Sequence, residues 1–287
     1  MNAVLLLLVA ASSAAASKLS PAASTSFADA PIPPSEREFL INGWRWHHRS
    51  VLRELRRFIR CLERVDACEP ESLRRALDAR EFVWGFSWSA LHGIEVDLYL
   101  PWLRQQLPAA TFGSELDELQ RELAEVWSLG ERIGRELPPP PAAGGAVAAA
   151  PAARPPAAAA PALALAARLG LRPPGGGGAP TAEVVQALEL SRRLEQLAGR
   201  VYARTERTLV PGVAAYVPRP EQERFNDKVL KYLGVWPSRV HLCGMAEAIN
   251  GDDAELLQFK RQIPKVARMM LPRWRRKLYL PRTECLR

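Results

Sequence analysis

The chain has 287 residues, 48% of them hydrophobic, which is enough to bury at least one full core. Its formal net charge is +8, but Arg and Glu are interspersed along most of the expected helices, so the charge indicates solvated helix faces and no nucleic-acid partner is expected. No phosphate-binding loop, dinucleotide fingerprint or nucleophile motif is present, which argues against a conventional kinase, dehydrogenase or hydrolase.

The first 35 residues have the features of a targeting segment. An apolar run from Ala3 to Ala11 is followed by small residues at Ala14 to Ser17, as in a cleaved signal peptide, although no basic residue precedes the run. The run is too short to span a bilayer comfortably. A stretch rich in Ser, Ala and Pro follows, which is typical of an organelle transit peptide. We therefore expect residues 1–35 to be removed or disordered, and the protein to enter the secretory pathway or an organelle such as a plastid without spanning the membrane.

Four long amphipathic helices are expected after this segment. The first covers about Glu36 to Val65, where apolar residues recur at spacings of three and four. The second covers 71–107, with a break near Gly85. The third starts with Ser114 as its N-cap and ends before the proline run at 138, and the fourth covers 181–217. No segment has a convincing strand pattern, so the sequence predicts an all-α fold built on an antiparallel four-helix bundle.

The rest of the chain divides into a linker and an extension. Residues 138–180 are nearly all Ala, Pro and Gly, which predicts a disordered linker between bundle helices at 36–137 and 181–217. Residues 218–287 are expected to form additional C-terminal helices. They include LPRWRRKLYLPR, where five basic residues surround Trp274 and Tyr279 with no acid among them. We expect this segment to close against the bundle, and contact with a membrane surface or an anionic partner is the alternative.

The four cysteines allow two interpretations. In an oxidising compartment, Cys61 and Cys68 would close a small disulfide loop between two helices, and Cys243 and Cys285 would remain. Four unpaired and mostly buried thiols are an equal alternative.

Two segments of the expected second and fourth helices share one pattern. HGIEVDLYLP starts at His92 and YARTERTLVP starts at Tyr202, and each reaches a closing proline over the same length, with an aliphatic residue before it. This pattern resembles the hemerythrin-like family, also called the HHE cation-binding domain, in which a helix carries H-x-x-x-E and then a Leu-x-Pro-like ending. The resemblance covers roughly residues 36–216. It implies a four-helix bundle that holds a di-iron site between its helices, with further histidines from the first and usually the third helix.

The resemblance implies a set of metal ligands that this chain carries only in part. The candidates are His48 with His47 as its substitute, His92, Glu206, Glu95 and Tyr202. Residues four apart project from one helix face, so the motif pairs an imidazole with a carboxylate on one ion. The motif carboxylate of the second helix falls on Val96, so Glu95 would have to replace it. The motif histidine of the fourth helix falls on Tyr202, and the third helix has no histidine.

Two functions follow from this partial set. The resemblance implies non-haem iron, as one ion or a pair, with binding or sensing of O2 or another small ligand. The alternative is a metal-free helical scaffold or protein-interaction module, in which Val96 and Tyr202 refill the centre and the remaining polar groups satisfy one another. A binding protein is expected rather than an enzyme, although oxidase or peroxidase chemistry belongs to the iron hypothesis.

Overall fold

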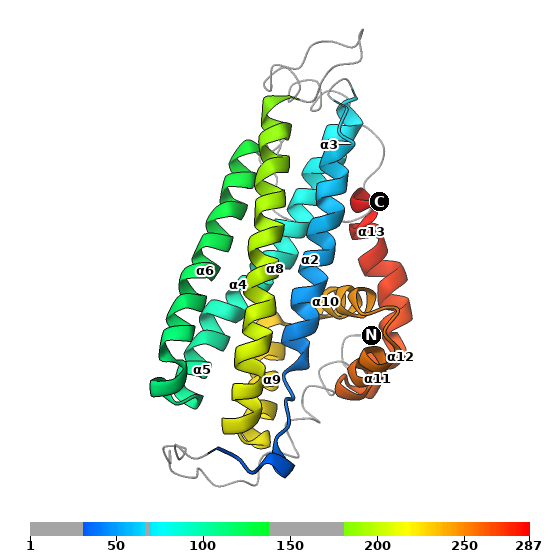
Figure 1. Ribbon diagram of the computed structural model, residues 1–287. Coiled ribbons are helices and arrows are strands. Elements are labelled where there is room, and N and C mark those ends of the chain that lie inside the picture. The colour runs from blue at the N-terminus through cyan, green and yellow to red at the C-terminus, as the bar shows by residue number, and fades with distance from the viewer. Residues whose placement is uncertain (1–30, 67–68, 138–180) are drawn as a thin grey trace. The chain divides into compact units, whose positions relative to one another are not determined.

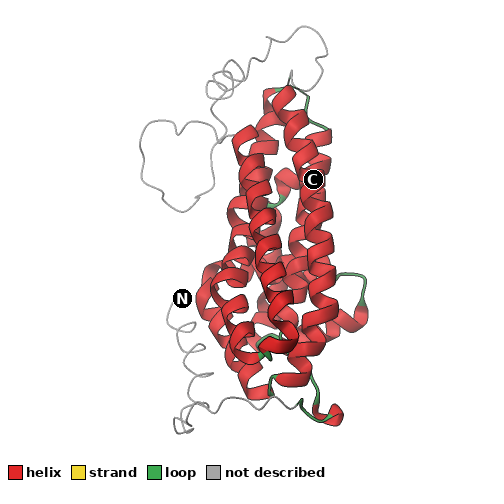
Figure 2. Cartoon of the chain, turned by 60° about the vertical axis from the view of Figure 1, so that its left-hand side comes forward, coloured by secondary structure: helices red, strands yellow, loops and turns green. Residues whose placement is uncertain are grey.

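The computed structural model describes residues 31–66, 69–137 and 181–287. Residues 1–30 of the expected targeting segment, Cys68 and the 138–180 linker lie outside these residues. Residues 31–35 of that segment are described, and the Ile32 N–H donates a hydrogen bond to the Ala215 carbonyl at 2.6 Å. Within the described residues every element is helical and no strand occurs, which confirms the all-α prediction (Figure 2). Nothing in this part of the chain is long and apolar enough to form a membrane-crossing helix.

The first long helix, α2, covers Asn42–Glu63. The expected start at Glu36 is wrong, because that residue ends the short 3-10 helix η1 (Pro34–Glu36) and Arg37 is extended. The predicted apolar face is confirmed. It consists of the buried residues Trp44, His48, Val51, Leu55, Phe58 and Leu62.

A second long helix follows without a break from Pro70 to Gln106. It consists of α3 (Pro70–Arg80), η2 (Glu81–Trp88), α4 (Ser89–Gly93), η3 (Ile94–Tyr99) and α5 (Leu100–Gln106). The segments η2 and η3 are π-helical, with wider turns that shift the faces of the residues after them. The expected break near Gly85 is therefore wrong, since Gly85 lies inside η2. The shift also decides which side chain of the HGIEVDLYLP segment faces inward: Glu95 is buried, whereas Val96 is 39% exposed.

The third and fourth long helices are α6 (Ala109–Glu136) and α8 (Ala182–Tyr216). The predicted N-cap Ser114 is wrong, because α6 starts directly after Pro108, whose carbonyl accepts hydrogen bonds from the N–H groups of Thr111 and Phe112. The start of α8 is as predicted, with the Thr181 side chain accepting a hydrogen bond from the Val184 N–H.

The four long helices lie side by side, and successive helices run in opposite directions along the colour ramp of Figure 1. Helix α8 packs against both α6 and α2, the α3 and η2 parts of the second helix pack on α2, and α5 packs on α6. Their inward residues form the main hydrophobic core.

The C-terminal part adds four further helices to this core. They are α9 (Arg219–Leu233), α10 (Val235–Ala248), α11 (Asp253–Gln262) and α12 (Lys265–Trp274), followed by η4 (Arg275–Tyr279), α13 (Leu280–Arg282) and η5 (Glu284–Leu286). Helix α10 packs directly on α2, and a second apolar cluster includes Trp46, Met245 and Phe259. The extension is thus an integral layer on α2.

The basic C-terminal segment contributes to the core through Tyr279. Tyr279 is buried, and its hydroxyl donates a hydrogen bond to Glu54 Oε1 at 3.1 Å. This agrees with closure against the helices, while Arg273, Arg276 and Lys277 are exposed, so that their contact with a membrane or an anionic partner stays a prediction. The cysteines described, Cys61, Cys243 and Cys285, are free thiols.

Candidate functional site

The centre of the long helices contains a buried polar pair. His48 comes from α2 and Glu95 from η3, and they are 1% and 2% exposed. His48 Nε2 lies 2.9 Å from Glu95 Oε1, a hydrogen-bonding distance. The two candidate ligands are therefore bonded directly to each other.

Aromatic rings enclose this pair. The Tyr202 ring, from α8, lies flat on the His48 imidazole, with ring centroids 3.8 Å apart and planes 7° from parallel. Trp44 meets the same imidazole edge-on at 4.2 Å, and Tyr99 lies 4.6 Å from Trp44. These rings exclude water from the pair, which strengthens its hydrogen bond and makes a net charge there costly.

Burial sets the protonation of the pair. It raises the pKa of Glu95 well above its ordinary value, and it lowers the pKa of His48 well below its own, with smaller contributions from His47 and Arg45. The carboxyl group keeps its proton and donates it to Nε2 of the neutral imidazole. Beyond the N–H of the neutral imidazole, the pair thus holds one titratable proton, that of the Glu95 carboxyl, and it has no net charge.

Several polar atoms around the pair have no hydrogen-bond partner within the described residues. They include His48 Nδ1, Tyr99 OH and Tyr202 OH, whereas the Trp44 N–H lies close enough to the Glu95 carboxyl to lower its pKa in part. Unmet buried polar atoms are unusual in native proteins and call for an explanation, such as a bound group. The fit of a metal at this centre therefore depends on how many suitable donors converge there.

His92 and Glu206 do not join this centre. The His92 imidazole stacks on Trp127 of α6, with centroids 4.3 Å apart. Glu206 forms an ion pair with Arg45 at 3.3 Å, and its side chain is 24% exposed. His92 and Glu206, which were expected at one centre with His48 and Tyr202, each contact a partner on a neighbouring helix instead. The residues brought together are His48, Glu95 and Tyr202.

These residues do not fit a di-iron centre. Over the described ranges, no three His, Cys, Asp or Glu side chains come together in a group that could hold a metal ion. A di-iron site draws several carboxylates and imidazoles from facing helices, whereas this centre supplies one of each, already bonded together. Tyr202 presents its ring face to His48. The expectation that Val96 refills the centre is wrong, because Val96 is exposed.

His47 belongs to a different site. Neighbouring residues on a helix point about 100° apart, so His47 and His48 cannot face the same centre. The His47 ring lies 4.8 Å from that of His241 on α10, and His241 stacks on Phe86. His47 is therefore no substitute for His48. No sequence pattern links His241, which lies on α10, with His47 on α2; the adjacent histidines of WRWHHR were the only available signal.

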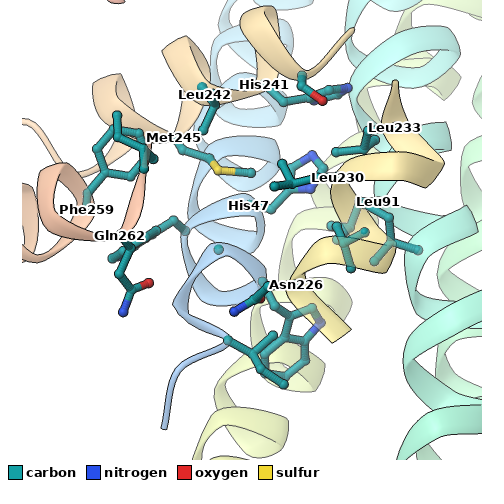
Figure 3. Close-up of a pocket in the computed structure, with 18 of the residues that line it drawn as sticks. His47, Leu91, Asn226, Leu230, Leu233, His241, Leu242, Met245, Phe259 and Gln262 are labelled. Carbon is teal, nitrogen blue, oxygen red and sulfur yellow. The ribbon is translucent and has the colours of Figure 1, made fainter. Parts of the chain in front are cut away.

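A cavity of about 150 Å³ adjoins the His47–His241 pair. Its wall comes from α2, α9, α10, α11 and the Leu91–Ile94 region of the second helix. Figure 3 shows the side chains of His47 and Met245 pointing toward each other from α2 and α10. Leu230 and Leu233 of α9 lie on the opposite side of His47 from Met245. The wall is mostly apolar, with the two imidazoles among its few polar groups.

Comparisons with protein-family models, with curated proteins and with solved structures find no match for this chain.

Proposed function

We propose that α2, the Pro70–Gln106 helix, α6 and α8 form an antiparallel four-helix bundle of the hemerythrin-like kind, in which the metal centre has been replaced by the His48–Glu95 pair. The protein is then a metal-free helical binding module. The observation that carries the proposal is the direct 2.9 Å bond between His48, which matches a ligand position of the family, and Glu95, which lies one residue before such a position.

The contacts around the pair support the replacement of the metal centre. At the motif histidine position, Tyr202 fills the space with its ring against His48. His92 and Glu206, which match the other ligands, make contacts with Trp127 and Arg45. A di-iron pair with the family's ligands would require both side chains to leave these partners and the His48–Glu95 bond to break.

A substitution at position 202 tests the proposal. Tyr202→His would add a third donor beside His48 and Glu95, whereas Tyr202→Phe keeps the ring and removes only the hydroxyl. A ligand that binds only the folded state stabilises it by about 2.7 kcal/mol at a hundred times its Kd. We therefore expect ferrous iron, under anaerobic conditions, to raise the unfolding midpoint of Tyr202→His and to leave wild type and Tyr202→Phe unchanged.

Two results would count against this account. An iron-dependent rise in wild type as large as that of Tyr202→His would show that the native residues already form a metal site. No rise in Tyr202→His would show that His48, Glu95 and the new imidazole do not hold iron together, which would contradict the inference that position 202 keeps the place of a metal ligand.

A further inference from the structure

The cavity beside α2 has two buried imidazoles that the proposed bundle centre does not use. His47 and His241 are 2% and 4% exposed, and the Nε2 atom of each has no hydrogen-bond partner among the described residues. A buried polar atom without a partner costs roughly 1–3 kcal/mol. Two such atoms at one cavity therefore indicate that something else bonds to them.

The imidazoles are neutral at physiological pH. Burial lowers the pKa of His47 from 6.5 to about 4 and lowers that of His241 well below its ordinary value. A neutral imidazole has one N–H donor and one acceptor nitrogen. The pair can therefore bond a group that donates, accepts or does both, but it offers no charge to balance an ion.

The apolar side chains of the cavity wall restrict the size and polarity of a ligand that fits inside. Leu91, Ile94, Phe225, Leu242 and Met245 are among the apolar side chains around the space. A cavity of about 150 Å³ with such a lining takes a molecule of about the size of benzene. An ionised molecule would lose its hydration there without an opposite charge.

We propose that this cavity binds a small neutral molecule with an apolar body of one ring and a hydroxyl or similar hydrogen-bonding group, which His47 and His241 hold. This binding site is separate from the His48–Glu95 centre and does not depend on whether that centre binds a metal. Access is at α9, where Leu230 lines the cavity and is itself 46% exposed.

Phenol and toluene form a matched pair of probes, because they are nearly equal in size and differ in the hydroxyl. One hydrogen bond to a buried partner corresponds to about tenfold in affinity. We expect calorimetric titration of the full chain to show saturable binding of both, with phenol about tenfold tighter. His47→Leu and His241→Leu should each abolish this preference. His92→Leu is the matched control, since His92 lies outside the cavity, and it should retain the preference.

A second measurement on wild type covers the case in which a variant fails to fold. On addition of phenol, the imidazole ¹⁵N resonances of His47 and His241 should shift, while those of His92 should not. Equal affinity for phenol and toluene, absence of saturable binding, or unchanged ¹⁵N resonances of His47 and His241 would each overturn the proposal.

Discussion

Replacing Glu95 with Gln tests whether the buried pair holds a single proton. In the folded chain the pair keeps one proton, because burial raises the pKa of Glu95 and lowers that of His48. In the unfolded chain the same two groups hold two protons below about pH 4.5, one up to about pH 6.5 and none above it. The Gln amide can still donate to His48 Nε2, so the hydrogen bond survives while the carboxyl proton is lost.

The expected magnitude follows from proton counting. Stability changes by about 1.4 kcal/mol per pH unit for each proton by which the unfolded and folded states differ. The wild-type pair gives no slope between pH 4.5 and 6.5, and it loses stability as the pH rises above 6.5. In Glu95→Gln, folded His48 binds no proton, so stability is lost as the pH falls below 6.5 and is constant above it. Between pH 5.5 and 7.5 the variant should gain about 3 kcal/mol relative to wild type.

Urea unfolding at pH 5.5, 6.5 and 7.5 measures this difference. The exposed Glu125→Gln is the matched control for a carboxyl-to-amide change, and it should stay within about 0.5 kcal/mol of wild type. Parallel pH profiles for wild type and Glu95→Gln would refute the reasoning, because the folded pair would then hold no proton beyond that of neutral His48.

Two further predictions concern stability. Burial raises the pKa of Glu54 from 4.5 to about 7, so this group alone lowers the stability of wild type by about 3 kcal/mol as the pH rises between these values. Relative to wild type, Glu54→Gln should therefore gain about 3 kcal/mol over this range in urea unfolding, and a variant profile parallel to that of wild type would contradict it. A Cβ at Gly130 would overlap the Trp84 ring, so Gly130→Ala should cost about 1–3 kcal/mol, whereas Gly199→Ala, with open space, should gain about 0.5–1 kcal/mol. Equal effects in thermal unfolding would refute this packing argument.

The helices could be predicted from the sequence because their period is local. The face of α2 through Val51 and Leu55 follows directly from the spacing of apolar residues. The π-helical segments could not be predicted this way, since a wider turn depends on packing against other helices. The spacing rule consequently assigned the inward position to Val96, whereas the structure assigns it to Glu95.

Only part of the candidate site could be predicted from the sequence. The alignment of the second and fourth helices identified Tyr202, the family's first-helix histidine identified His48, and Glu95 was named only as the replacement for Val96; these three residues do meet. The alignment could not show that His92 has a stacking partner on α6, because that contact joins helices through tertiary packing. For the same reason, no spacing pattern pairs His47 with His241.

The central claim is that the His48–Glu95 pair takes the place of a metal. The most direct measurement is the iron content and optical spectrum of the wild-type chain after anaerobic loading with ferrous iron, removal of unbound metal and exposure to air. The account predicts no stoichiometric iron and no absorption band of an oxo-bridged ferric pair. Stoichiometric iron together with that band would contradict it.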